Sequence, residues 1–297
     1  MSLGLVVVTY KSSDVLATFL DSLKDSTVLP DTVIVVDNSP TVLTPPPTPW
    51  LPSLEVIHRP ENPGYGSAAN IGVAALPDDC DWVVVCNPDI TVTAQTLEVL
   101  LAEAERRPDS GALGPAISNE DGSLYPSARA LPTLGVGIGH ALFGVAWPNN
   151  PWTRAYRGDY RGSSTREAGW LSGSFLLLRK EAFDRVGGFD EGYFMFFEDV
   201  DLGWRISDAG YRNYYVPAAS AIHLGGHSTQ SNYDLMLQAH HHSAVRFIGK
   251  RYPGPLFCPM RTVIGAGLTV RERVLRGKAL QLSKPEVEGP ESPNNQA

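Results

Sequence analysis

Short apolar runs that alternate with helical patterns decide what kind of fold this chain can adopt. Residues 3–8, 32–36 and 82–86 are almost uninterrupted apolar segments rich in valine, which is typical of strands buried on both faces of a sheet. Residues 12–24 carry apolar side chains at helical spacing, and residues 62–76 form a Gly-rich turn that enters an Ala-rich helix. Repeated strand–helix–strand units predict an α/β fold with a mostly parallel central sheet flanked by helices.

The rest of the chain continues this alternation and ends in a polar tail. We expect one domain over residues 1–242, a basic amphipathic helical extension over 243–280, and a disordered tail over 281–297. Residues 124–166, rich in Gly, Pro, Trp and Arg, predict loops around a site. The other predicted elements are strands over 54–58, 170–179 and 211–217, and helices over 93–106 with Thr93 as the N-cap, 181–186, 198–209 and 233–248.

Composition and charge exclude several classes of protein. The net charge of −8 argues against a nucleic-acid-binding surface that extends over the whole chain. The three cysteines include no CxxC pair, so the chain lacks a disulfide framework and we expect a reducing compartment. The N-terminus has no basic region of a signal peptide, and no apolar run approaches the roughly 20 residues that span a membrane.

Basic residues gather in one segment of this acidic chain. Residues 243–280 hold eight Lys or Arg against one Glu, a net charge of +7, which leaves −15 for the remainder. Apolar residues are interleaved with these bases, a pattern that favours a helix lying on an anionic membrane surface. A solvated helix packed on the domain is the alternative.

Polar side chains stand at the ends of the predicted strands, where ligands bind in parallel α/β sheets. Thr9 and Tyr10 follow the first strand, Asp37 ends the second, and Asn87-Pro88-Asp89 follows a later one. An acid such as Asp89 beside a nucleotide site is able to hold a divalent cation that bridges two phosphate oxygens. The same tripeptide is also ordinary turn chemistry, so its spacing leaves both interpretations open.

Three carboxylates, Glu198, Asp199 and Asp201, lie within four residues and follow an aromatic run. Apolar surroundings raise carboxylate pKa values, which makes one of these groups a candidate general base. The alternative is an acidic first helical turn stabilised by the helix dipole. The spacing alone does not choose between the two.

Five of the seven histidines lie between residues 222 and 242. We expect His223, in a loop at the end of a strand, to complete a metal shell in preference to the triplet at 240–242. The Gly-rich turn at 62–66 suits close approach of an anion, but it is neither a P-loop nor GxGxxG. With no GxSxG elbow in the chain either, a dinucleotide oxidoreductase and a serine hydrolase are both disfavoured.

Several segments, taken in order, resemble the inverting GT-A glycosyltransferases of family 2. They are VVVTY, VIVVDNSP, ENPGYGSAAN, VVVCNPD, GWLSGSFLLLR and GGFDEGYFMFFEDVDLGWR, within about residues 3–227. The resemblance implies a GT-A fold and an inverting transfer, and the absence of the processive QxxRW motif implies that one sugar is moved. More narrowly, the chain is similar to the rhamnosyltransferases that build the actinobacterial cell-wall linkage unit in the segments GALGPAI, DGSLYPSAR, NPW, GWLSGS and FMFFEDVDLGWR.

That narrower similarity implies the substrates and the location. The donor would be dTDP-L-rhamnose, and the acceptor N-acetylglucosaminyl-diphospho-polyprenol at the cytoplasmic face of the plasma membrane, where the protein would be peripheral. Other donor sugars, a sugar nucleotidyltransferase and a noncatalytic nucleotide-sugar binding protein remain alternatives, and a homo-oligomer is left open.

The resemblance also assigns roles to residues. Asp199 matches the catalytic base, with Glu198 as the fallback, and Mg²⁺ or Mn²⁺ would be held by Asp89 and His223. Asp37 would accept a hydrogen bond from the pyrimidine N3–H, and at Asn87 the family often has Asp. The donor side comprises Thr9, Tyr10, Asp37, Asn62, Gly64, Asn70 and Asn87, and the acceptor side Trp170, Gly173 and Ser174.

Overall fold

The computed structural model describes residues 1–132, 147, 150–151, 164–225 and 233–282. Expectations for the intervening residues, and for the tail beyond residue 282, lie outside this description. The chain divides into two compact units, Met1–Asn232 and Tyr233–Ala297.

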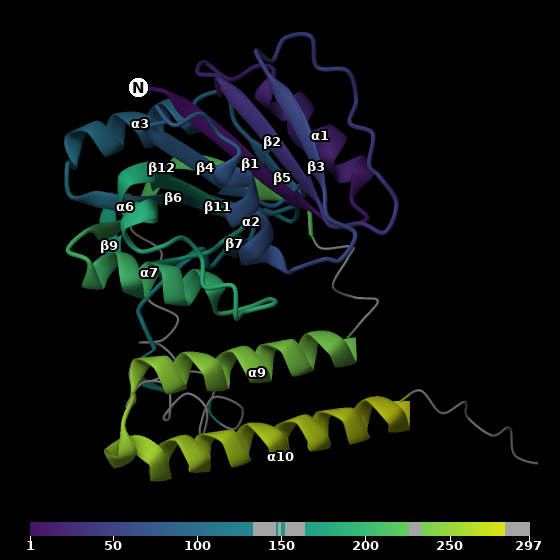
Figure 1. Cartoon of the computed structure of the whole chain (residues 1–297), viewed down its shortest axis with the longest axis vertical. Helices are drawn as coiled ribbons and strands as arrows, with labels where there is room; N and C mark the ends of the chain where they lie inside the picture. Colours follow the sequence, from purple (N-terminus) through teal and green to yellow (C-terminus); the bar gives the residue numbers. More distant parts are fainter. Residues whose placement is uncertain (133–146, 148–149, 152–163, 226–232, 283–297) are drawn as a thin grey trace, which may run out of the picture. The chain divides into compact units, whose positions relative to one another are not determined.

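The first unit is built around a mixed sheet that has ten strands among the described residues (Figure 1). The main path follows the order β3-β2-β1-β4-β11-β6-β12-β5, while β7 pairs with β6 and β9 with β12. The strands are β1 (Leu3–Thr9), β2 (Thr32–Asp37), β3 (Leu54–His58), β4 (Trp82–Cys86), β5 (Ile90–Val92), β6 (Ser110–Asn119), β7 (Leu124–Tyr125), β9 (Arg166–Ala168), β11 (Phe175–Arg179) and β12 (Arg212–His223). The first four strands of this path, β3, β2, β1 and β4, are mutually parallel. Strand β11 runs antiparallel to both of its neighbours, β4 and β6.

Helices cover both faces of this sheet, as the alternating sequence predicts. Successive side chains of β1 point to opposite faces, so Leu5 and Val7 join one buried cluster and Val6 joins the other. The first cluster includes residues of α1 and α3, and the second includes residues of α2, α6 and α7. These helices are α1 (Ser13–Leu23), α2 (Tyr65–Ala74), α3 (Thr96–Arg106), α6 (Lys180–Arg185) and α7 (Glu198–Asp208).

The structure corrects several boundaries. Helix α3 begins at Thr96 with Gln95 as N-cap, so the expected cap at Thr93 is wrong. The strand expected over 170–179 is two strands, because Ser172–Ser174 separate β11 from β10 (Trp170–Leu171), which pairs with β8 (Ala128–Arg129). Strand β12 extends to His223, where pairing with β6 and β5 continues beyond the expected end.

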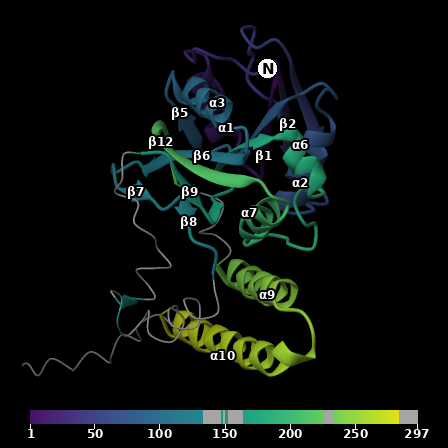
Figure 2. The ribbon, with the colours of Figure 1, turned by 90° about the vertical axis from the view of Figure 1, so that its left-hand side faces the viewer.

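The second unit contains two helices that lie side by side (Figures 1 and 2). They are α9 (Tyr233–Arg251) and α10 (Cys258–Leu282), joined through the short 3₁₀ helix η1 (Pro255–Phe257). The domain boundary expected between residues 242 and 243 falls inside α9, which runs through it without a break. None of the helices in the described ranges is long and apolar enough to cross a membrane.

Candidate active site

The ends of β1 and β2 form a closed polar cluster. Asp37 is fully buried. Its Oδ1 accepts hydrogen bonds from the Thr9 hydroxyl and the Ser39 N–H, both at 3.1 Å, and its Oδ2 accepts one from the Leu43 N–H at 2.9 Å. This carboxylate therefore holds the loop after β2, and its contact with a pyrimidine base stays a prediction. The half-buried Tyr10 ring lies 5.3 Å from the Lys11 ammonium.

The Gly-rich turn before α2 has the backbone conformation that its sequence suggests. Gly64 has φ +95°, and a Cβ there would lie 2.3 Å from the Phe194 carbonyl oxygen, so only glycine fits. The next residue, Tyr65, donates its N–H to that same oxygen at 3.1 Å. Asn62, at φ 47°, accepts a 3.4 Å hydrogen bond from the Gly64 N–H. The turn is thus attached to the segment that precedes α7.

Asn70, one turn further along α2, uses its side chain within the protein. Its Oδ1 accepts the Phe189 N–H at 2.8 Å and its Nδ2 donates to the Phe189 carbonyl at 2.9 Å. The expected contact of Asn70 with the donor stays a prediction.

Asp89 and His223 come together at the edge of the sheet. The pairing of β12 with β5 sets His223 opposite Ile90, and the Asp89 Oδ2 lies 3.3 Å from the His223 Nε2. The Asp89 Oδ1 is buried and has no hydrogen-bond partner among the described residues. The Tyr125 ring lies 5.3 Å from the imidazole.

This pair fits a divalent cation, because an unpartnered carboxylate oxygen and an imidazole nitrogen are both ligands that such an ion accepts. Within the described part of the chain, no cluster of three or more His, Cys, Asp or Glu is placed to hold a metal. The neighbouring Asn87 donates its backbone N–H to the Ser174 carbonyl at 3.0 Å, and its side chain is half-buried. The remaining ligands would have to come from the donor diphosphate or from water.

Asp199 lies at the N-terminus of α7, and its carboxylate accepts hydrogen bonds from two backbone N–H groups. Its Oδ2 accepts the Gly173 N–H at 3.0 Å and its Oδ1 accepts the Val200 N–H at 2.8 Å. The Gly173 carbonyl in turn accepts the Tyr65 hydroxyl at 2.5 Å. The acceptor-side residue Gly173 and the expected base are therefore brought together, with Tyr65 as a third member.

Burial controls the protonation of this group of side chains. It raises the pKa of Asp199, against the opposing effects of the Gly173 and Val200 N–H groups and the Arg129 charge. Burial also raises the pKa of Glu198 to about 8, with the Asp199 charge as the second cause. The raised pKa favours the neutral form of Glu198, and a neutral Glu198 removes one negative charge from the surroundings of Asp199.

The Tyr65 hydroxyl feels the charge of both acidic groups. Its pKa is raised well above the ordinary value, first by burial and then by the charges of Cys86, Glu198, Asp199 and Asp89.

The remaining acceptor-side residues lie in packed surroundings. Trp170 is buried and donates its indole N–H to the Ala130 carbonyl at 3.2 Å. The Arg129 guanidinium lies 5.5 Å from the centre of its ring. The Ser174 hydroxyl lies 3.1 Å from that of Ser172. In the segment 124–166, which the sequence predicts to form loops around a site, the arginines at 154, 157 and 161 lie outside the described residues.

Three side chains of this region received no individual role from the sequence. Tyr65 and Tyr125 were visible only inside the motifs that carried the resemblance, and Arg205 only as part of the last one. Apart from the pair of Asp201 and Arg205, four residues apart on α7, their contacts reach residues far along the chain, which leave no local pattern. The histidine triplet lies on α9, where His241 is 3.5 Å from Glu272 of α10.

Known proteins with similar sequences are glycosyltransferases. The sequence profile of glycosyl transferase family 2 matches residues 5–187. N-acetylglucosaminyl-diphospho-decaprenol L-rhamnosyltransferase of Mycobacterium tuberculosis is 41% identical over 292 residues, 95% of each chain. Rhamnosyltransferase WbbL of Escherichia coli is 33% identical over 194 residues, 63% of this chain and 71% of that protein.

A solved structure has a similar fold. The mannosyltransferase PcManGT from Pyrobaculum calidifontis, in complex with GDP-Man and Mn²⁺, superimposes with a TM-score of 0.54 at 17% identity. The match covers 95% of this chain and 81% of that one.

Proposed function

The chain belongs to glycosyl transferase family 2, and from that premise we propose that it transfers one L-rhamnosyl residue from dTDP-L-rhamnose to N-acetylglucosaminyl-diphospho-polyprenol. The observation that carries the proposal is the 41% identity, over 95% of both chains, to a rhamnosyltransferase named for that acceptor type. The site supports it with a half-buried carboxylate at Asp199 and a second polar pair, Asp89 and His223.

In the proposed reaction the acceptor hydroxyl attacks the anomeric carbon of rhamnose in a single displacement, which inverts the configuration there. The new bond joins the acceptor oxygen to that carbon, and the bond from the carbon to the diphosphate breaks. Asp199 takes the hydroxyl proton, and the Gly173 N–H keeps its Oδ2 in place. Because burial raises its pKa, Asp199 is a stronger base than an exposed carboxylate.

Asp89 and His223 would hold Mg²⁺ or Mn²⁺ at the donor diphosphate. A bound cation of this kind stabilises the negative charge on the departing nucleoside diphosphate. Asp89 suits this role because its Oδ1 is left without a hydrogen-bond partner in the described residues. The Tyr125 ring beside His223 limits the orientation of the imidazole.

The second unit would keep the protein at the inner face of the plasma membrane. Val263 and Val270 lie seven residues apart on α10 and therefore on one helical face, and their side chains are 71% and 58% exposed. Leu256, in the preceding 3₁₀ helix, is 84% exposed. Arg271 and Arg273 add positive charge next to this apolar surface, as binding to an anionic leaflet requires.

The test is a donor screen with purified protein and a short-chain polyprenyl-diphosphate acceptor bearing N-acetylglucosamine. We expect a product heavier by one deoxyhexose from dTDP-L-rhamnose, with release of dTDP and an inverted anomeric centre by NMR. Transfer from another sugar nucleotide alone would overturn the donor assignment. Release of pyrophosphate would indicate a nucleotidyltransferase, and donor binding without any transfer would indicate a noncatalytic binding protein.

A further inference from the structure

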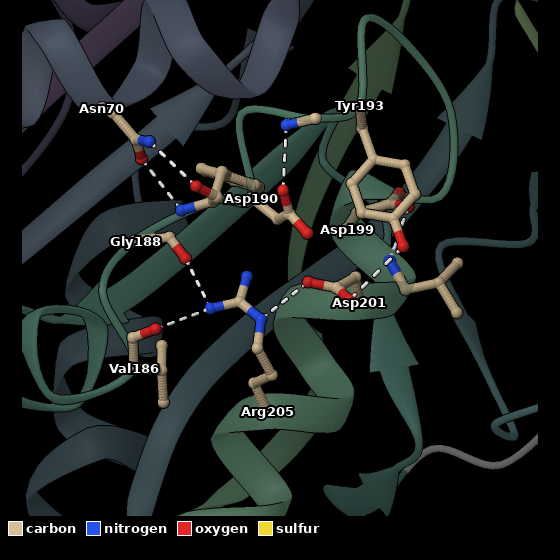
Figure 3. Close-up of polar contacts among 11 residues, drawn as sticks. Asn70, Val186, Gly188, Asp190, Tyr193, Asp199, Asp201 and Arg205 are labelled. Atoms are coloured by element: carbon tan, nitrogen blue, oxygen red, sulfur yellow. Dashed lines mark hydrogen bonds and ion pairs between the residues drawn. The ribbon is translucent and has the colours of Figure 1, made fainter. Parts of the chain in front are cut away.

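The segment between α6 and α7 is held from one side by a single arginine. Figure 3 shows Arg205 of α7 reaching back to this segment, where its Nη1 donates to the Val186 carbonyl at 2.8 Å and to the Gly188 carbonyl at 2.7 Å. Its Nε donates to the Asp201 Oδ2 at 2.6 Å. One planar guanidinium therefore ties two backbone carbonyls to the helix that carries Asp199.

Asp201 keeps this arginine in place. The Asp201 side chain is fully buried, and its Oδ1 accepts the hydroxyl of the buried Tyr193 at 3.4 Å. The Asp201 N–H donates to the Phe197 carbonyl in the first turn of α7 at 2.8 Å. A buried carboxylate needs a charged, hydrogen-bonded partner, so Asp201 and Arg205 depend on one another.

Asn70 of α2 holds the same segment from its other side. Its two hydrogen bonds with the Phe189 backbone (Figure 3) attach the segment to α2. Gly188, at φ +71°, makes room for this contact, because a Cβ there would lie 2.5 Å from the Asn70 Oδ1. At the other end of the segment, the Phe194 carbonyl accepts the Tyr65 N–H. The segment thus links the Gly-rich turn to the base-carrying helix.

The chain enters α7 in a strained conformation. Phe196 and Phe197 have φ values of 67° and 65°, the left-handed region that bulky side chains rarely occupy. Such residues persist only where the surrounding structure holds them. They immediately precede Glu198 and Asp199, so the position of the base depends on contacts that keep this entry in place.

We propose that Arg205 is a positioning residue of the transfer reaction, which together with Asp201 holds the segment 186–197 so that Asp199 stays on the Gly173 N–H. The inference rests on the proposed function in one respect, the assignment of Asp199 as the base. The Nε and Nη1 groups of Arg205 are occupied by Asp201, Val186 and Gly188. Its Nη2 has no hydrogen-bond partner among the described residues but is buried and closed to a substrate, so Arg205 acts through the backbone. Lysine, a point charge without the planar fork, cannot reproduce these three contacts.

The experiment compares Arg205→Lys with Arg212→Lys, a matched change at an exposed arginine whose Nε lies 3.9 Å from Glu167. Misplacing the base lowers the rate of the chemical step without weakening donor binding. We therefore expect kcat of Arg205→Lys to fall by about tenfold to hundredfold. The KM for the donor should stay within about twofold, where a binding contact would have raised it. Amide hydrogen exchange should accelerate at Gly173 and over residues 194–200, and neither readout should change in Arg212→Lys.

Unchanged kcat and exchange in Arg205→Lys would overturn the inference, as would an equal loss of kcat and donor affinity. If Arg205→Lys does not fold, the same criteria apply to Tyr193→Phe, which removes the hydroxyl that donates to the Asp201 Oδ1. Should the wild type transfer no sugar, the proposed function fails, while the exchange measurement still decides whether Arg205 positions α7.

Discussion

Replacing Glu198 by Gln should make the stability of the protein less dependent on pH. The Glu198 carboxyl group is almost entirely buried, and burial together with the Asp199 charge raises its pKa from 4.5 to about 8. In the unfolded chain the group is exposed to water and titrates near its ordinary value. The folded protein therefore binds one proton more than the unfolded chain between these two pH values.

The sign and the size follow from this difference in bound protons. The full stability is present below pH 4.5, where both states are protonated, and is lost as the pH rises through 8. Each pKa unit corresponds to about 1.4 kcal/mol, so the whole shift is worth about 5 kcal/mol. Between pH 5 and pH 8 the free energy of unfolding should fall by about 3 to 4 kcal/mol on account of this group.

Gln carries no titratable proton, so the free energy of unfolding of Glu198→Gln does not fall with pH on account of this position. We expect its free energy of unfolding, relative to the wild type, to rise by several kcal/mol from pH 5 to pH 8. The assay is urea denaturation followed by tryptophan fluorescence at four pH values. Glu105→Gln, at an exposed position on α3, is the control and should run parallel to the wild type. A difference between Glu198→Gln and the wild type that stays constant with pH would refute the reasoning.

The same variant separates the two acidic residues chemically. If Glu198 is a neutral carboxylic acid at pH 7, Gln is a close mimic of the form that is present, and transfer should be largely retained. If the Glu198 carboxylate were the general base, Glu198→Gln would lose about 10²- to 10⁴-fold in rate, and the assignment of Asp199 would be wrong.

Three further outcomes are expected. Asp199→Asn should lose at least about 10²-fold in kcat with near-normal nucleotide affinity, measured by rate assays and calorimetry. If this variant keeps more than about a tenth of wild-type activity, Asp199 is not the general base. A chelator should stop transfer, and Asp89→Ala should weaken donor binding chiefly when metal is present. Full activity in chelator would contradict the metal role and would mean that arginines stabilise the departing diphosphate. The protein should sediment with anionic liposomes in a salt-sensitive way, at about 1 kcal/mol per basic residue, and Arg271→Glu with Arg273→Glu should weaken this; equal binding to neutral liposomes would contradict it.

Local patterns were enough to predict much of the sheet and the position of several polar residues. The strands at 54–58 and 82–86 match β3 and β4 in full. An unbroken apolar run is typical of a fully buried strand such as β4, whereas β3 is a partly exposed strand at the end of the sheet. Strand β6 was not predicted, since its SGALGPAISN sequence contains two glycines and a proline. Pairing with β11 and β12 outweighs this weak local preference.

The sequence by itself determined the kind of fold, several of its strands and the chemical groups at the ends of these strands, because these follow from periodicity and residue type. Only the tertiary structure decided which groups meet. The Gly173 N–H reaches Asp199 across 26 residues, and the Tyr65 hydroxyl reaches Gly173 across 108. Burial, which raises the pKa of Glu198 and leaves Asp89 with an unpartnered oxygen among the described residues, is likewise a property of the packed protein. Contacts between distant residues leave no periodic trace in the chain, so no local pattern contains them.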